Sequence, residues 1–277
     1  MGIRGASTSE EAASGTNITA PRPPRVGMSL RFEFPDARDW RYLIESLKEI
    51  IEEASFVADG EGLRLRALDP SRIAMVDLYL PRESFGAYEI EEEQVKIGVN
   101  FDDFDKILKR AKAQDKIICT VEGGRLRVTL AGKAERTFSL PILDIVGEEL
   151  PVPKVTFDVM AKMVSDSLRD ALKEAALISD SVKMIGDEKE LKLQARSDKG
   201  EWEAIFSLEK GSLIEYEVRQ PAQSSYSLTY LEEIIGKAYR LSDLVTIEFS
   251  TNKPLCLTFD IAGGGVLKFY LAPRLES

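Results

Sequence analysis

The side chains that could perform catalysis in this sequence are almost all carboxylates. The chain has 277 residues, of which 47 are Asp or Glu, none is His and only two are Cys. Without histidine the chain lacks the commonest general base, the Ser-His triads and every histidine-ligated metal site. Cys119 and Cys256 stand in apolar runs without metal-ligand spacing, so we interpret them as core residues rather than a disulfide pair.

A carboxylate-bound metal pair is the catalytic chemistry that remains, because composition alone does not exclude a two-metal nuclease. Asp69, Asp77, Asp144 and Asp260 are nevertheless explained by predicted turns and strand edges. The sequence also lacks the phosphate loop Gly-x-x-x-x-Gly-Lys-Ser/Thr and a Gly-x-Gly-x-x-Gly motif after a strand. We therefore predict no catalytic residue, no metal site and no cofactor, and the nuclease stays as an alternative.

Lysines and arginines at helical spacing offer a second kind of chemistry, the binding of phosphates. Apolar stripes predict four amphipathic helices, at residues 36–53, 102–112, 160–176 and 230–240. Their polar faces carry basic side chains, namely Arg41, Lys48, Lys106, Lys109, Arg110, Arg169, Lys173, Lys237 and Arg240. Basic groups that contact only phosphates read no base sequence. The alternative is an ordinary solvated face whose cations have acidic partners.

Strand-like segments follow these helices, and the second half of the chain repeats the first. Strands are predicted at 62–67, 73–80, 116–122 and 125–130, the last two joined by a Gly123-Gly124 hairpin turn. Lys48 and Lys173 lie in matching Leu-Lys-Glu triplets 125 residues apart, and Lys109 matches Lys237 at an offset of 128 residues. This duplication predicts an α+β protein with two similar helix-plus-sheet domains. The fourth helix is expected to open with the capping box Thr229-x-x-Glu232.

Two segments do not fit the repeat. Residues 1–27 are rich in Ser, Ala, Gly, Thr and Pro and predict a disordered tail, although a start at Met28 would remove it. Residues 139–153 contain three prolines and predict an extended linker docked on a surface. We therefore divide the chain into a tail (1–27), a first domain (28–141), a connector (142–154) and a second domain (155–277).

Composition limits the partners and the setting. The formal net charge of −10 means that any contact with nucleic acid must be local. No apolar stretch reaches the ~20 residues of a membrane span, so we expect a soluble, cytoplasmic protein with no membrane partner. Charged residues make up 30% of the chain while Asn and Gln are scarce, which favours a thermophilic source.

Several segments resemble the proliferating cell nuclear antigen (PCNA) family of DNA sliding clamps. Residues 62–80, Gly-Leu-Arg-Leu-Arg-Ala-Leu-Asp-Pro-Ser-Arg-Ile-Ala-Met-Val-Asp-Leu-Tyr-Leu, resemble the first-domain signature of the family. Residues 267–276, Leu-Lys-Phe-Tyr-Leu-Ala-Pro-Arg-Leu-Glu, resemble its C-terminal end. The resemblance covers residues 30–276 and is to the archaeal type, which implies a nucleoid-associated protein of a thermophilic archaeon.

The resemblance implies a non-enzymatic DNA polymerase processivity factor with the DNA-clamp fold. Three chains would close head to tail into a ring, and helices would line a hole for double-stranded DNA of any sequence. The basic channel positions implied by the family are Arg41, Lys48, Lys106, Lys109, Lys173 and Lys237. Tyr42 and Thr229 stand where basic residues are also common. The seam would pair the strand around 136–142 with that around 201–207 of another clamp subunit, in a homotrimer or a heterotrimer.

The resemblance also implies a pocket for short peptides that carry a glutamine and hydrophobic or aromatic anchors. A loop, the connector and the C-terminal end would supply its walls: Leu68, Arg72, Ile73, Met75, Leu150, Val152, Pro254, Tyr270, Ala272 and Pro273. Arg72 departs from a frequent histidine of the family, and core packing is the alternative for Ile73, Met75 and Leu150.

The same family implies the partners of such a ring. A clamp loader would open it with its own ATP and close it on DNA, and a DNA polymerase, a flap endonuclease and a DNA ligase would dock through their peptides. The alternative within the fold is a checkpoint-type clamp that assembles from unlike chains and is loaded at damage sites.

Overall fold

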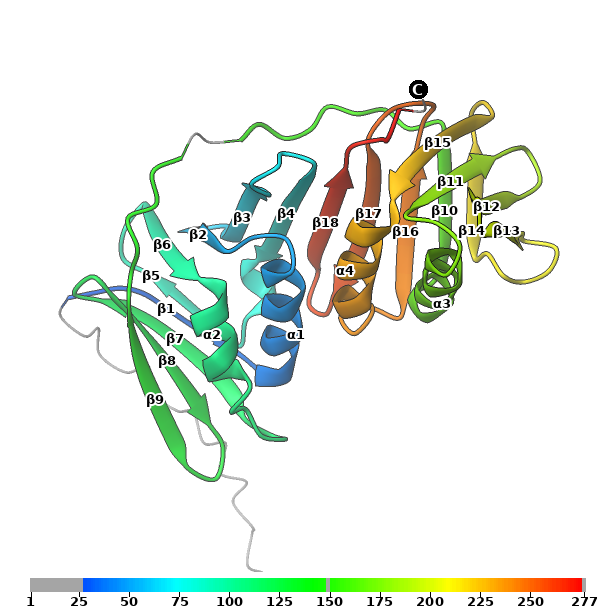
Figure 1. Cartoon of the computed structure of the whole chain (residues 1–277). Coiled ribbons are helices and arrows are strands. Elements are labelled where there is room, and N and C mark those ends of the chain that lie inside the picture. Colours follow the sequence, from blue (N-terminus) through cyan, green and yellow to red (C-terminus); the bar gives the residue numbers. More distant parts are fainter. Residues whose placement is uncertain (1–26, 148–149, 276–277) are drawn as a thin grey trace, which may run out of the picture.

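Residues 27–147 and 150–275 are described by a computed structural model of the chain (Figure 1). Almost all of the predicted tail lies outside these described residues. The first half contains, in order, β1 (Met28–Phe34), α1 (Ala37–Lys48), β2 (Glu53–Asp59), β3 (Gly62–Leu68), β4 (Ala74–Pro81), the 3-10 turn η1 (Arg82–Ser84), β5 (Ala87–Ile90), β6 (Gln94–Asn100), α2 (Phe101–Leu108), β7 (Lys116–Glu122), β8 (Arg125–Ala131) and β9 (Glu135–Pro141).

The second half repeats this order of elements. It contains β10 (Val159–Val164), α3 (Ser165–Ala176), β11 (Ser181–Gly186), β12 (Leu191–Ser197), β13 (Gly200–Phe206), β14 (Glu215–Val218), β15 (Ala222–Ser227), α4 (Leu228–Ala238), β16 (Leu244–Phe249), β17 (Leu255–Ile261) and β18 (Gly265–Leu271). The α+β class and the two-domain arrangement expected from the duplication are therefore confirmed.

One sheet runs through both halves of the chain. Its nine strands have the order β14-β10-β16-β17-β18-β4-β3-β2-β6, and the halves meet where β18 pairs antiparallel with β4. A five-stranded sheet, β5-β1-β7-β8-β9, belongs to the first half, and a four-stranded sheet, β13-β12-β11-β15, belongs to the second. Because a shared ladder fixes the backbones of both halves, we infer that the two domains of one chain behave as one body.

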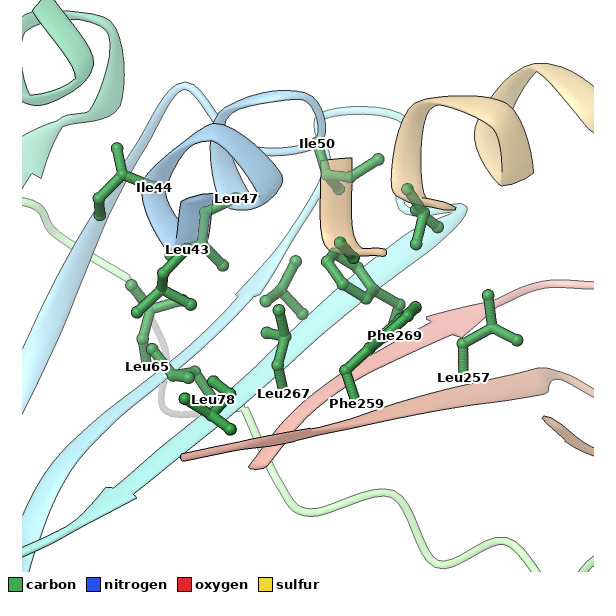
Figure 2. Close-up of a cluster of buried hydrophobic side chains, with 14 of the residues drawn as sticks. Leu43, Ile44, Leu47, Ile50, Leu65, Leu78, Leu257, Phe259, Leu267 and Phe269 are labelled. Atoms are coloured by element: carbon green, nitrogen blue, oxygen red, sulfur yellow. The ribbon is translucent and has the colours of Figure 1, made fainter. Parts of the chain in front are cut away.

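The helices stand in a row on one side of the sheets, in the order α2-α1-α4-α3 (Figure 1). Leu43 and Leu47 of α1 point to the central sheet, where Leu65, Leu78 and Leu267 meet them (Figure 2). All five side chains are at most 2% exposed. Burial of such leucines stabilises by about 1.5–3 kcal/mol each, so the apolar stripes hold the polar faces outward on a rigid support.

The sequence misplaced the end of the first helix and the beginning of the third, whereas the third helix ends at Ala176 as predicted. Helix α1 ends at Lys48 instead of residue 53, and strand β2 already begins at Glu53. Helix α3 begins at Ser165 instead of residue 160. Residues 159–164 form β10, with every second side chain buried, a period of two that belongs to a strand.

The other two helices also differ in their bounds. Helix α4 begins at Leu228, two residues earlier than expected, and its N-cap Ser227 makes no side-chain cap bond. Thr229 therefore lies inside the helix, and the predicted capping box is wrong. Helix α2 begins after Asn100, whose side chain accepts a hydrogen bond from the amide of Asp103 at 3.1 Å, and it ends at Leu108.

The duplication extends to side chains. Tyr88 donates hydrogen bonds to the carbonyls of Asp59 and Gly62 at 2.8 Å, and Tyr216 donates to those of Asp187 and Glu190 at 2.7 and 2.8 Å. Both tyrosines fix the turn of the hairpin that follows the first helix of their half. They lie 128 residues apart, the same interval that separates the starts of α1 and α3.

The interval of 128 residues corrects one match made from the sequence. In α3, Lys173 occupies the ninth position, which in α1 is held by Glu45, whereas Lys48 corresponds to Ala176. The Leu-Lys-Glu triplets are therefore out of register by three residues. The second match, Lys109 with Lys237, keeps the interval of the fold.

The chain passes from one half to the other along an extended segment that follows Pro141 (Figure 1). It starts with a bridge to the edge strand β6, in which the amide of Leu143 donates to the carbonyl of Gly98 at 2.9 Å. Farther on, Nη1 of Arg66 donates to the carbonyl of Leu150 at 2.8 Å. These contacts support the expectation that the linker docks on a surface.

Candidate functional sites

Lys48 and Lys109, two of the predicted DNA-facing residues, meet at a buried carboxylate. Oδ2 of Asp105 lies 2.9 Å from Nζ of each, and the side chain of Asp105 is only 1% exposed. Burial raises the pKa of Asp105, but the hydrogen bonds from Lys109 and Lys48 outweigh it and hold the pKa below its usual range. The hydrogen bond to Asp105 also raises the pKa of Lys48. This cluster fastens α1 to α2.

A second buried carboxylate joins the two domains. Glu45, with a side chain 6% exposed, lies 2.9 Å from Nε of Arg41 and 3.0 Å from Nη1 of Arg240. Arg41 stands one turn earlier on α1, whereas Arg240 follows α4 of the second domain. The predicted channel residue Arg41 is therefore bound to a carboxylate that also connects α1 to the end of α4.

The remaining predicted channel residues are more accessible. Lys106 is 74% exposed and pairs at 3.0 Å with the exposed Asp103. Lys237 is 37% exposed and lies 3.8 Å from Glu49, which caps the end of α1. Lys173 is exposed and has no carboxylate partner within the described residues. Because exposed pairs contribute about 0–1 kcal/mol, Lys106 and Lys237 can exchange their carboxylate partners for a phosphate at small cost, and Lys173 has no such partner to give up in the part of the chain that the structure describes.

The acidic partners favour the alternative interpretation, in which these residues form ordinary solvated helix faces. Five of the six predicted channel residues have a carboxylate within 4.0 Å, Lys173 being the exception. All six nevertheless stand on the row of helices or at its ends. Their position is compatible with contact to a polyanion, while their charge is largely compensated.

The structure brings Arg169, Arg240 and Tyr42, which the sequence analysis named, together in a group around Tyr239, which it did not name. The guanidinium of Arg169 lies 4.2 Å from the ring centre of Tyr239, and that of Arg240 lies 5.7 Å from the same ring and 5.5 Å from Tyr42. The group joins α3, α4 and α1. Its signal in the sequence was the Tyr-Arg pair at 239–240, but the distance to α1 depends on how the helices pack.

The predicted peptide pocket is partly assembled by the central sheet. Leu68 pairs with Met75, and Met75 pairs with Tyr270, so the three side chains form a row across β3, β4 and β18. The row lies on the face away from the helices, because the alternate residues Leu65, Leu78 and Leu267 face them. Burial raises the pKa of the Tyr270 phenol. The ladder continues one step past β18, since the amide of Ala272 donates to the carbonyl of Ile73 at 2.9 Å.

The pocket residues differ in exposure. Ile73 is 39% and Val152 59% exposed, so both side chains are accessible to a ligand. Met75 is only 9% exposed and packs largely as a core residue. Arg72 is exposed and has a left-handed φ of 58°. Leu150, Pro254, Ala272 and Pro273 are half-buried.

Arg66 is the contact that brings the connector to this pocket, and the sequence did not predict it. Its guanidinium binds the carbonyl of Leu150 and lies 3.2 Å from Oδ1 of Asp77. It stands two residues before Leu68 on the same face of β3. The connector therefore passes over the end of the row formed by Leu68, Met75 and Tyr270. No link is seen between Val152 and the pocket within the described residues.

Two edge strands, β9 and β13, lie at opposite ends of the molecule (Figure 1). Strand β9 ends the five-stranded sheet and β13 ends the four-stranded sheet, so each has one unpaired side within the described residues. Phe138 and Leu140 of β9, and Trp202 and Ala204 of β13, are partly buried against the core. A cavity of about 560 Å³ is lined mainly by residues of β11, β12 and β13, Glu203 among them, so it lies apart from the peptide pocket on β3, β4 and β18.

Two further observations concern metals and membranes. In residues 27–147 and 150–275, no three Cys, Asp or Glu side chains are grouped so as to hold a metal ion. None of the helices in the same ranges is long and apolar enough to cross a membrane.

Comparison with known proteins gives consistent matches along almost the whole described chain. The family model of the PCNA N-terminal domain matches residues 30–139, and that of the C-terminal domain matches residues 151–274. The DNA polymerase sliding clamp of Thermofilum pendens is 56% identical over 247 residues, which are 89% of this chain and 100% of the relative. The DNA polymerase sliding clamp 1 of Pyrobaculum aerophilum is 44% identical and covers 87% of this chain and 96% of its own.

Solved structures agree with these matches. PCNA from Thermococcus kodakaraensis superimposes with a TM-score of 0.85 at 32% identity, covering 89% of this chain and 100% of that one. A chain of the PCNA2-PCNA3 complex from Sulfolobus tokodaii gives a TM-score of 0.82 at 32% identity, with the same coverage.

Proposed function

The chain belongs to the proliferating cell nuclear antigen family of DNA polymerase sliding clamps, and from this premise we propose that it closes into a ring around duplex DNA and tethers replication and repair enzymes to it. The observation that carries the proposal is a continuous row of helices in a molecule whose opposite ends are formed by the edge strands β9 and β13 (Figure 1). Joining such edges head to tail extends the sheets and removes the edges that would otherwise aggregate.

The two edges of this chain complement each other. The helix-side residues of β9 and β13, Phe138 and Trp202 among them, would continue one apolar layer across the seam. On the outer face, exposed Arg125 and Arg127 stand one strand back from β9, and exposed Glu203 stands on β13. Opposite charges steer association and select the partner. We therefore propose a homotrimer, in which every seam joins two copies of this chain.

The ring would hold DNA by topology rather than by affinity. Because the charges that line the hole are largely compensated, no position along the DNA would bind its phosphates strongly. Each added phosphate contact would increase the salt dependence of binding. The exposed Lys106, Lys173 and Lys237 would provide brief contacts. The clamp would have no catalysis of its own, and a clamp loader would open and close it with ATP.

Partner enzymes would dock on the outer face through short peptides. The half-buried Leu68 and Tyr270, on either side of the buried Met75, and the exposed Ile73 offer apolar surface for hydrophobic and aromatic anchors. A polymerase, a flap endonuclease and a ligase held there would act at a raised effective concentration on the template.

The proposal is tested by the molar mass of the purified protein, measured by light scattering at several concentrations. We expect three times the chain mass of 30.9 kDa, and stimulation of primer extension by a polymerase that carries the peptide. Glu203→Arg should shift the mass toward the monomer, whereas Glu188→Arg, the same charge change on the exposed β11–β12 turn, should not. A monomer or dimer that completes a ring only with other clamp chains would refute the homotrimer. Hydrolysis of DNA with magnesium or manganese would refute the non-enzymatic role.

A further inference from the structure

The loop between β3 and β4 is folded around one buried carboxylate. Asp69 is 5% exposed, and its Oδ1 accepts hydrogen bonds from the amides of Ile73 at 2.7 Å and Ala74 at 2.8 Å. Its Oδ2 accepts from the amide of Ser71 at 3.2 Å. The carboxylate therefore holds both ends of the loop that presents Ile73 and the left-handed Arg72.

The fourth hydrogen bond to this carboxylate comes from the other domain. The hydroxyl of Tyr230, in the first turn of α4, donates to Oδ2 of Asp69 at 2.7 Å. Burial raises the pKa of Asp69, but this bond and the loop amides outweigh it and keep the pKa below its usual range. The carboxylate is therefore ionised at neutral pH and is a strong acceptor.

We propose that Tyr230 is a positioning residue for the partner-peptide pocket, acting through Asp69 on the loop that carries Ile73. This inference rests on the proposed function, because it requires a peptide that binds at the pocket. It connects a helix of the DNA-facing row with the outer surface on which partners would dock.

Tyr230 can position the loop because the two oxygens of the Asp69 carboxylate accept different hydrogen bonds. With Tyr230 in place, Oδ2 has a short bond that fixes the rotamer of Asp69, and Oδ1 is then aimed at Ile73 and Ala74. Without the hydroxyl, Oδ2 keeps only the longer bond from Ser71. A loop that is less fixed must be ordered by the peptide, and ordering reduces affinity.

The test measures the affinity of a fluorescein-labelled synthetic peptide with a glutamine, an aliphatic anchor and an aromatic anchor, using the full chain in its assembled state. Tyr230→Phe removes the hydroxyl and keeps the ring. We expect binding weaker by about 5-fold to 10-fold, which is less than the full loss of one hydrogen bond to a charged group, because the loop keeps its amide bonds to Asp69. The matched control is Tyr216→Phe on β14, four strands from β18, which removes a hydroxyl that donates to the backbone carbonyls of Asp187 and Glu190 in the β11–β12 turn. It should leave peptide affinity unchanged.

Two readouts separate positioning from a general loss of structure. Hydrogen exchange at the amides of Ile73 and Ala74 should quicken in Tyr230→Phe and not in the control. In a double-mutant cycle, Tyr230→Phe should cost little further affinity once Asp69→Ala is present, because the hydroxyl acts through that carboxylate.

The possible results are distinguishable from a failure of the proposed function. If the wild-type protein does not bind the peptide, the pocket itself is refuted. If the wild type binds and Tyr230→Phe binds equally well, or if its effect adds fully to that of Asp69→Ala, the pocket stands and the role of Tyr230 is refuted. Should Asp69→Ala fail to assemble, affinity and exchange in Tyr230→Phe alone decide the question.

Discussion

Replacing Lys48 with alanine should destabilise the fold as well as remove a cation from the helix row. Nζ of Lys48 lies 2.9 Å from Oδ2 of Asp105, whose side chain is 1% exposed, and Lys109 is the other cation on that oxygen. A hydrogen bond to a charged group contributes about 1.5–3 kcal/mol. Because Lys109 remains and the Lys48 side chain is 22% exposed, we expect a loss of about 1–2 kcal/mol.

The assay is guanidinium unfolding at neutral pH, with a matched surface variant as the control. Lys106→Ala removes an ion pair whose two side chains are 74% and 59% exposed, so it should cost less than about 0.5 kcal/mol. Both variants should keep the wild-type dependence on denaturant. Equal losses in the two variants would refute the reasoning, because Asp105 would then behave as a solvated carboxylate.

The effect of Lys48→Ala should also depend on pH. The folded pKa of Asp105 is lowered, because the lysine bonds outweigh the effect of burial. The stability that its charge contributes is therefore present above the unfolded pKa of about 3.9 and is lost as the pH falls through the folded value. The difference in unfolding free energy between wild type and Lys48→Ala should shrink below about pH 4. A difference that stays constant into acid would contradict the assignment.

Three further changes test other parts of the structure. A Cβ at Gly98 would lie 2.0 Å from the carbonyl oxygen of Leu143, so Gly98→Ala should release the start of the connector and speed hydrogen exchange at the Leu143 amide; unchanged exchange would contradict this. Burial raises the pKa of Tyr88 to about 12, so its contribution to stability is complete below the unfolded pKa of about 10 and is lost as the pH rises through 12. Tyr88→Phe should remove this alkaline loss in unfolding free energy measured between pH 9 and 12. Arg240→Ala leaves the buried Glu45 with one arginine, and guanidinium unfolding should show a loss of about 1–2 kcal/mol, whereas no loss would mean that the pair between the domains is inert.

The sequence predicted the class of fold because its signals were local and repeated. Apolar stripes at helical spacing identified four helices, and the Gly123-Gly124 hairpin formed as expected, with φ of 56° and 73° at the two glycines. The bounds were less predictable. Residues 159–164 run into helix α3 without a break in apolar character. The change in the spacing of apolar residues, from every second residue to every 3.6 residues, became visible only in the structure, where β10 pairs with β14 and β16.

The sequence predicted which residues belong to the candidate sites, but not which residues surround them. Lys48 and Asp105 are 57 residues apart in the sequence, and Glu45 and Arg240 are 195 apart, so only the packing of helices brings each pair together. Asp69 was interpreted as a turn residue, which is correct, but its bond with Tyr230 spans 161 residues. Buried carboxylates of this kind leave no periodic signal, because one acidic residue on a helix normally indicates a solvated face.

The central claim is that the protein holds DNA by encircling it. The most direct measurement loads the labelled protein onto a nicked circular duplex with an archaeal clamp loader and ATP, isolates the complex by gel filtration, and then cuts the circle once. We predict that the protein stays with the intact circle and leaves the linear product through its ends. Equal retention on circular and linear DNA would show that the protein binds the outside of the duplex, and would contradict the clamp.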